Sequence, residues 1–189
     1  MKEKRIVFMG NSITEGWKNT DPGFFEGRPY IDRGISGQTT PQMLIRFRPD
    51  VIDLKPAIVI ILAGINDIAE NTGPMTLEET AGNIFSMAQL AKAANIKVII
   101  SSVLPANTFP WRPEIKPAEK VIELNILLKQ YCEENRITYL DYYSHMVDDK
   151  KGLDPRYGDD GVHPNLAGYK VMEGLVENAI KSALEKNGK

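Results

Sequence analysis

A serine, an aspartate and a histidine occur in this 189-residue chain in contexts that favour nucleophilic chemistry. Ser12 lies in GNSIT, directly after the apolar run RIVFM, where a serine either caps the next helix or serves as a nucleophile. A serine hydroxyl attacks only when a base accepts its proton, so a catalytic Ser12 requires a histidine. That base must be one of the two histidines in the chain.

His163, in GDDGVHPN, is the better candidate for the base. Asp160 stands three residues before it, and Gly161 between them permits a tight turn. The carboxylate can then reach the ring nitrogen that does not face the serine, fixing the tautomer and stabilising the imidazolium. A helix-entry turn in which both side chains are satisfied locally explains the same residues. His145, in YYSHMVDD, has no neighbouring glycine to turn an orienting acid back onto its ring and is expected to be structural or exposed.

Acyl transfer through a serine also needs donors for the negative oxygen of a tetrahedral intermediate. The backbone N–H of Ser12 at the start of a helix is one candidate, and the N–H of Gly37 in ISGQTT is a second. The side-chain amide of Asn66 in GIND is a third. Each has a structural alternative, because Gly37 can simply shape a turn and Asn66 can simply cap the segment after a strand.

The pattern of apolar residues predicts where these groups meet. Five short apolar runs alternate with segments of helical spacing, which indicates a parallel sheet covered by helices on both faces. We therefore predict one three-layer α/β/α domain over residues 1–189. The expected strands are Arg5–Met9, Tyr30–Ile35, Ala57–Ala63, Ile96–Val103 and Ile137–Leu140, and helical stripes run through residues 81–91, 121–131 and 166–183, the last with Asn165 as its cap.

The candidate groups follow the first three of these strands. GNS follows the first, residues 34–38 the second and GIND the third, so their side chains should converge at the carboxyl edge of the sheet. The irregular segment Leu104–Pro117 follows the fourth strand at the same edge, and its four prolines exclude a regular element.

Taken in order, GNSIT, the glycine of RGISGQ, GIND and DGVHP resemble the motif blocks of the SGNH hydrolases, also called the GDSL lipase/acylhydrolase family. The resemblance runs from residue 5 to about 175. The lone G-x-S is weak, but the four blocks in this order are specific. The G-x-S-x-G turn of α/β-hydrolases is a different motif, since residue 14 here is threonine.

The resemblance implies an enzyme, a serine-dependent carboxylic ester hydrolase without a cofactor or metal. It implies Ser12 as nucleophile, His163 as base and Asp160 as the acid that orients it. It also implies an oxyanion hole formed by the Ser12 amide, Gly37 and Asn66. The implied fold is flavodoxin-like, with five parallel strands in the order 2-1-3-4-5.

One position departs from the family pattern. Asn11 stands where the first block commonly has aspartate, which keeps an acceptor oxygen but removes a charge. The departure affects local hydrogen bonding and substrate preference near Ser12 rather than the reaction class.

Composition limits the possible partners. The net charge is −2 with basic residues scattered, so nucleic acid is not expected as a partner. No apolar stretch is long enough for a membrane span. The single cysteine, Cys132, excludes an internal disulfide and is expected to be a packed bystander. We expect a cytoplasmic protein from the chain as written, and a periplasmic or secreted one if a signal peptide has been removed.

The preferred substrate is a small acyl ester, with acetyl on a carbohydrate as the leading hypothesis. Trp111, between prolines, is the aromatic residue most expected to face the site, and Arg112 beside it either meets an anion or is solvated. Other aromatic residues near the catalytic edge can equally be core: Trp17, Phe24, Phe25 and Phe109.

Three alternatives stay open. A thioesterase or lysophospholipase uses the same groups on longer acyl chains. A non-catalytic carbohydrate-binding domain keeps the fold alone. Metal-dependent hydrolysis through Asp159, Asp160 and His163 leaves Ser12 and Asn66 without roles.

Overall fold

The computed structural model describes residues 4–185 and has a five-stranded, all-parallel sheet at its centre. The strand order is β2-β1-β3-β4-β5, which confirms the order that the family resemblance implied. β1 therefore lies between β2 and β3, and the residues after these three strands emerge side by side. The strands are β1 (Ile6–Gly10), β2 (Tyr30–Gly34), β3 (Ile58–Ile61), β4 (Lys97–Ser101) and β5 (Thr138–Leu140).

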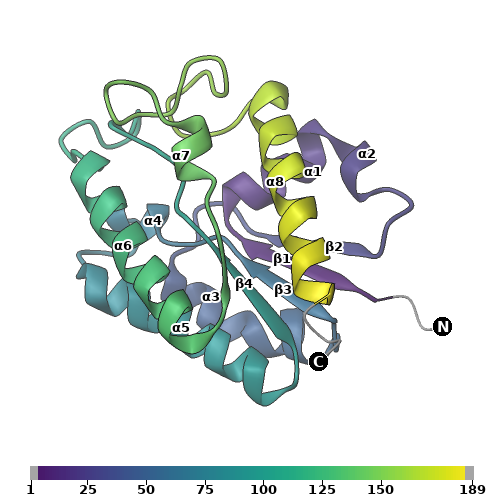
Figure 1. The fold of residues 1–189 in the computed structure, drawn as a ribbon. Coiled ribbons are helices and arrows are strands. Elements are labelled where there is room, and N and C mark those ends of the chain that lie inside the picture. The colour runs from purple at the N-terminus through teal and green to yellow at the C-terminus, as the bar shows by residue number, and fades with distance from the viewer. Residues whose placement is uncertain (1–3, 186–189) are drawn as a thin grey trace.

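Helices cover both faces of the sheet (Figure 1), as the sequence predicts for a three-layer α/β/α fold. One face carries α1 (Ser12–Thr20), α2 (Pro22–Phe25) and α8 (Leu166–Glu185), and the other carries α3 (Thr40–Phe47), the π-helical turn Arg48–Ile52, α5 (Leu77–Ala93) and α6 (Ala118–Asn135). Two single-turn helices, α4 (Ile65–Ile68) and α7 (Tyr143–Met146), lie in the connections after β3 and β5. No helix within residues 4–185 combines the length and apolarity needed to cross a membrane.

The strands form where the sequence is most apolar. Every residue of β1 and β3 is buried, because helices pack against both faces of these central strands. Burying one large aliphatic side chain contributes about 1.5–3 kcal/mol, so such runs specify the centre of the sheet. Ile6 pairs with Ile58 and Met9 with Ile61, and this register brings the ends of the two strands level.

The helix starts are encoded locally. Thr76 and Glu79 form a capping box that begins α5, and the Asn165 side chain accepts a hydrogen bond from Gly168 in the first turn of α8, as predicted. The apolar spacing of the sequence gives no signal for α3, although Thr39 and Gln42 form a second capping box there. The segment 104–117 contains no helix or strand, which confirms that prediction.

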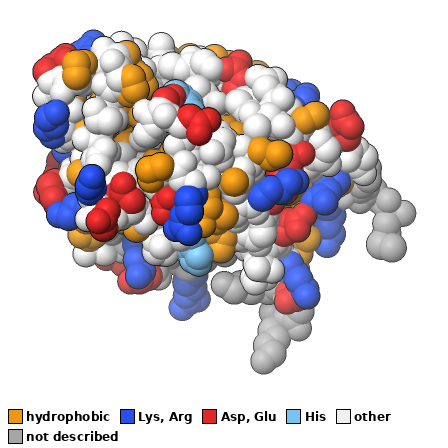
Figure 2. Space-filling model, turned by 90° about the horizontal axis from the view of Figure 1, so that it is seen from above, with side chains coloured by type: hydrophobic (Ala, Val, Ile, Leu, Met, Phe, Trp, Pro, Cys, Tyr) orange, Lys and Arg blue, Asp and Glu red, His pale blue; other side chains and the backbone are white. Residues whose placement is uncertain are grey.

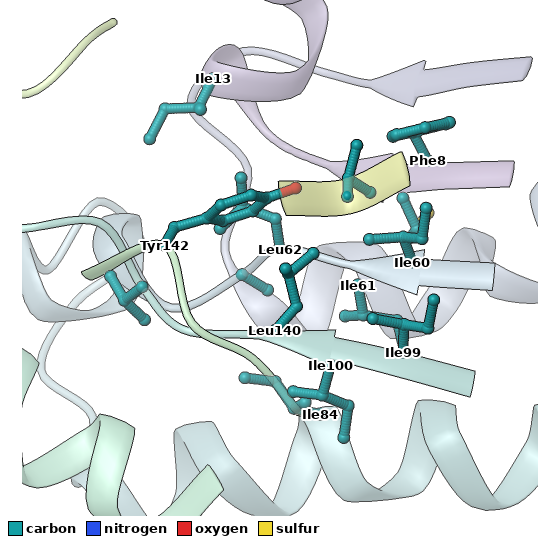
Figure 3. Packing of buried hydrophobic residues seen from close by; sticks show 14 of the residues in the cluster. Phe8, Ile13, Ile60, Ile61, Leu62, Ile84, Ile99, Ile100, Leu140 and Tyr142 are labelled. Carbon is teal, nitrogen blue, oxygen red and sulfur yellow. The ribbon is translucent and has the colours of Figure 1, made fainter. Parts of the chain in front are cut away.

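Tyr142 is a polar exception in the apolar core. Its ring lies among buried aliphatic side chains, with Ile13 on one side and Leu62 on the other (Figure 3). The hydroxyl has no hydrogen-bond partner among the described residues, and burial raises its pKa. A buried, unpaired hydroxyl destabilises a fold, since it has exchanged its bonds with water for none.

We therefore expect Tyr142→Phe to stabilise the protein by about 1 kcal/mol, because it removes the unpaired hydroxyl and keeps the ring. Chemical denaturation of both proteins at the same pH measures the difference. A loss of stability in Tyr142→Phe would contradict this view of the hydroxyl.

Candidate active site

Ser12 is the first residue of α1, and only Asn11 separates it from the end of β1. The side chain of Asn11 accepts a hydrogen bond from the backbone N–H of Ile13 at 3.0 Å, so Asn11 rather than Ser12 caps the helix. The asparagine thus supplies the acceptor that the cap requires without the charge of an aspartate. The Ser12 hydroxyl is left for another partner.

That partner is His163. The Ser12 Oγ and His163 Nε2 atoms are 3.0 Å apart, and the Asp160 Oδ2 atom lies 2.6 Å from His163 Nδ1 on the opposite side of the ring. The other carboxylate oxygen of Asp160 accepts hydrogen bonds from the backbone amides of Val162 and His163. Ser12, His163 and Asp160 therefore form a continuous chain of hydrogen bonds, the arrangement that nucleophile, base and orienting acid require.

Asp160 is held in its charged form. Burial by itself raises the pKa of this carboxyl, but hydrogen bonds from the backbone amide and ring of His163 and from the Val162 amide outweigh it. The net effect is a pKa below the ordinary value of an aspartate. An ionised Asp160 favours the tautomer of His163 that carries its proton on Nδ1, which leaves Nε2 free to accept the proton of Ser12.

Docking of α8 against α1 brings the histidine to the serine. The Tyr169 hydroxyl on α8 donates a hydrogen bond of 2.8 Å to the carbonyl of Ile13, the residue after Ser12. The rings of Tyr169 and Trp17 stack with centroids 5.5 Å apart. Because His163 precedes α8 by only three residues, these contacts limit how far it can move from Ser12.

The predicted oxyanion donors lie in neighbouring connections. Asn66 is buried in α4, and its side-chain nitrogen donates one hydrogen bond to the Gln38 carbonyl at 2.9 Å. The amide has a second hydrogen, for which the described part of the chain shows no hydrogen-bond acceptor. Gly37 has φ of +76°, a conformation that favours glycine. The Gln38 bond thus ties the Asn66 side chain to the residue after Gly37. The Ser12 amide is at the first position of α1, where no intrahelical acceptor exists.

Gly34 lets the helix that carries the serine approach the sheet closely. A Cβ atom at this position would lie 2.1 Å from the backbone nitrogen of Glu15 and 2.7 Å from the carbonyl oxygen of Asn11. Any side chain here would push the first turn of α1 away from β2. The glycine therefore sets the position of the serine relative to the loop that follows β2.

The aromatic residues near the site divide into core and surface. Trp17, Phe24, Phe25 and Phe109 are buried, which confirms the core alternative for these four. Trp111 is 44% exposed, its ring is stacked on Phe109 with centroids 5.1 Å apart, and its centroid lies 6.2 Å from that of His163. Trp111 is thus the aromatic side chain presented beside the histidine.

The remaining candidate groups have local partners. The exposed His145 ring lies 3.0 Å from the Asp141 carbonyl and 3.2 Å from the Ser144 hydroxyl, both within its own turn. Cys132 is buried, and burial raises the pKa of its thiol to about 12. Within residues 4–185, no group of three or more His, Cys, Asp or Glu side chains is arranged to hold a metal ion.

Figure 2 views the surface from above, a face on which basic and acidic side chains are interspersed with scattered hydrophobic ones. This mixture matches the scattered charges of the sequence and the small net charge of −2.

Two residues near the site were not singled out by sequence reasoning. Arg46, on α3, donates hydrogen bonds to the Gly10 carbonyl at 2.9 Å and to the Gln38 side chain at 2.5 Å. Asp67, the last residue of GIND, accepts hydrogen bonds from Thr40. The GIND block was the available signal for Asp67, whereas nothing local in the sequence marks Arg46.

Residues 8–171 match the GDSL-like Lipase/Acylhydrolase family, a span that includes every group in the hydrogen-bond chain. The chain belongs to this family. The match confirms the resemblance derived from the four motif blocks and places the protein among ester hydrolases.

Solved structures and curated proteins agree with the GDSL assignment. A GDSL-like lipase from Bacteroides thetaiotaomicron VPI-5482 is 56% identical, with a TM-score of 0.94 over 96% of this chain and 90% of that one. Esterase TesA from Pseudomonas aeruginosa is 36% identical over 88 residues, which are 45% of this chain and 42% of that protein. Acetylxylan esterase from Geobacillus stearothermophilus is 24% identical over 147 residues, 75% of this chain and 67% of that protein. The match to TesA thus spans less than half of that relative.

The hydrogen-bond chain predicts how activity of this GDSL-family protein responds to substitution. Ser12→Ala and His163→Ala should each lower kcat for ester hydrolysis by at least about 10,000-fold, because neither group can be replaced by its neighbours. Asn66→Ala should lower kcat by about 100- to 1000-fold through the loss of one oxyanion donor. Steady-state kinetics with p-nitrophenyl acetate measures all three.

His145→Ala is the matched control, since it removes the other histidine of the chain. It should retain the parent rate, and circular dichroism should show each variant folded. Parent-level hydrolysis by folded Ser12→Ala would contradict the assignment of the nucleophile.

Proposed function

We propose that the protein is a serine esterase that removes a small acyl group, acetyl above all, through an acyl-serine intermediate. The observation that carries this proposal is the hydrogen-bond chain from Ser12 through His163 to Asp160. A carbohydrate ester is the substrate class that we favour.

The geometry supports a two-step reaction. His163 Nε2 accepts the proton of Ser12 as the Oγ atom attacks the carbonyl carbon, and the negative oxygen that forms is stabilised by the Ser12 amide, the Gly37 amide and the Asn66 side chain. His163 then gives this proton to the departing alcohol as the ester bond breaks. Water repeats the sequence on the acyl-serine, with His163 again as base, and releases the carboxylic acid and free Ser12. Asp160 stays ionised throughout and stabilises the imidazolium.

Several features favour a short acyl group. The segments that leave β1, β2 and β3 lead within a few residues into α1, α3 and α4, and no long apolar insertion of the kind that forms the lid of an interfacial lipase lies between these elements. The similarity to an acetylxylan esterase points in the same direction. Esterase TesA is similar as well, so a thioesterase or lysophospholipase acting on longer chains is the second candidate. A binding domain without activity would not require the aligned triad.

A series of p-nitrophenyl esters tests the acyl preference. We expect kcat/KM to be highest for acetate, lower for butyrate and lowest for octanoate. A long acyl chain needs a long apolar groove beside Ser12, whereas an acetyl group does not. Ser12→Ala run in parallel gives the background rate. A preference for octanoate would favour the second candidate, and Ser12-independent turnover of all three esters would contradict the proposal as a whole.

Trp111 supports a carbohydrate as the alcohol part of the ester. An aromatic ring with an exposed surface, supported from behind by Phe109, is suited to stack against the apolar face of a sugar ring. Its position beside His163 matches the leaving group, because the histidine must protonate the departing alcohol oxygen. Pro110 and Pro113 flank this part of the segment and limit its backbone freedom.

We expect Trp111→Ala to lower kcat/KM for tetra-O-acetyl xylose by about 10-fold, in line with an aromatic contact of about 1–1.5 kcal/mol. Hydrolysis of ethyl acetate, whose alcohol has no ring, should change by less than about 2-fold. Leu90→Ala is the control, since Leu90 is 40% exposed but lies on α5. An equal loss on both substrates would contradict sugar recognition by Trp111.

A further inference from the structure

Two consecutive residues of α4 hold the loop that contains Gly37. Asn66 donates to the Gln38 carbonyl at 2.9 Å, and Asp67 accepts two kinds of hydrogen bond from Thr40. The Thr40 hydroxyl lies 2.6 Å from Asp67 Oδ1, and the Thr40 amide lies 3.0 Å and 3.1 Å from the two carboxylate oxygens. The loop is thus bound on either side of residue 39 by neighbouring side chains.

Further contacts join the same two segments. The Asn71 side chain donates to the Gly37 carbonyl at 3.1 Å, and the hydroxyls of Thr39 and Thr72 lie 3.1 Å apart. Residues 37–40 are therefore contacted in turn by side chains from residues 66–72. Such a set of bonds fixes the relative position of the loop and of Asn66 more firmly than a single bond does.

Asp67 is the acidic member of this set and is almost completely buried. Burial raises its pKa above the ordinary value of an aspartate, and the hydrogen bonds from the hydroxyl and amide of Thr40 offset this only in part. Thr40 is the first residue of α3, so the carboxylate lies at the positive end of that helix. A buried carboxyl group does not contribute to solubility, and Asp67 is not part of the Ser12–His163–Asp160 chain. Its presence therefore requires another explanation.

Arg46 holds the other side of the loop. Its guanidinium donates to the Gln38 side chain and to the Gly10 carbonyl, and it also pairs with Asp50 at 2.6 Å. Since Gly10 precedes the Asn11–Ser12 turn, Arg46 connects the end of the serine strand to the loop. Asp67 connects the same loop to α4, where the third predicted donor lies.

We propose that Asp67 is a positioning residue of the oxyanion hole: its hydrogen bonds to Thr40 hold the Gly37 loop in register with the Asn66 amide. The inference rests on the proposed function, because it assigns Asp67 to the stabilisation of the same oxyanion. Asp67 does not touch the reacting atoms. It acts by keeping two donors at the separation that the tetrahedral intermediate requires, and displacements of about 1 Å in such groups lower rates by about 100-fold.

Substitutions at both ends of the Asp67–Thr40 contact test this role. Asp67→Asn keeps the size of the side chain but places an amide group against the Thr40 N–H. Thr40→Val replaces the hydroxyl by a methyl group, which removes its bond to Asp67 and the bond that it accepts from Asn83. Each should lower kcat for p-nitrophenyl acetate by about 10-fold or more with KM changed by less than about 2-fold, because the loss appears in the transition state. If Asp67→Asn does not fold, Thr40→Val by itself tests the positioning role of the Asp67–Thr40 contact.

Thr80→Val is the matched control. Thr80 is as deeply buried as Thr40, but its hydroxyl donates to the Thr76 carbonyl within its own helix. This variant should lose a comparable amount of thermal stability while kcat stays at the parent value. A fall in kcat that merely follows thermal stability across all three variants would overturn the proposal.

A double-mutant cycle with Asn66→Ala separates positioning from general structural support. If Asp67 acts by keeping the Gly37 loop in register with the Asn66 amide, Asp67→Asn or Thr40→Val should lower kcat by less than about 3-fold in the Asn66→Ala background, because the pair of donors whose separation they set no longer exists there. A full additional loss in that background would overturn the proposal. Parent-level kcat in Asp67→Asn and Thr40→Val would also overturn it. If Ser12→Ala is inactive in the same experiment, the esterase proposal still stands. Full activity of Ser12→Ala would instead remove the esterase proposal itself.

Discussion

The hydrogen bond between the Ser12 hydroxyl and the His163 ring joins residues that are 151 positions apart, and most of the fold contributes to keeping it at 3.0 Å. The serine is carried by the central part of the sheet, and the histidine by the segment that enters the last helix. A bond between two exposed loops would be lost to solvent and motion. Here both partners are held by rigid elements, since α1 begins at Ser12 and the buried Tyr169 of α8 binds the backbone of Ile13. The helices therefore set the geometry of the Ser12–His163 contact through which we propose that the proton moves.

The parallel sheet contributes a second constraint, because it places the ends of three strands next to one another. β1 pairs with β2 and β3 in register, so the segments after Gly10, Gly34 and Ile61 leave the sheet at the same edge. Gly34 permits α1 to approach β2, and Arg46 bonds to both the end of β1 and the loop after β2. These contacts convert a general property of α/β folds, a ligand site at the carboxyl edge, into a defined arrangement of donors.

Charge is used differently on the two sides of the serine. Asp160 is partly exposed and receives several hydrogen bonds, which keep its pKa low and the acid ionised beside the histidine. Asp67 belongs to α4 and is buried against the first residue of α3, and its partners are neutral groups of Thr40. The first carboxylate can stabilise a charge that appears during the reaction, whereas the second holds backbone in place. Both functions rely on fixed dipoles and charges that need no rearrangement when the substrate reacts.

The sequence by itself determined the five strands, the three longest helices and the order of the four motif blocks, and it nominated Ser12, Asp160, His163, Gly37 and Asn66 as site candidates. It could do so because apolar periodicity is a local signal and because these residue types occur at spacings typical of one family. It did not reveal α3, whose capping box sits beside a proline, nor the contacts of Asp67 and Arg46, nor which aromatic residues are core. Those features depend on side chains from distant segments packing together. Trp17 and Trp111 both lie near the catalytic edge, and the tertiary structure buries the first against α8 and leaves the second exposed beside His163, because burial is decided by neighbours that are remote in the sequence.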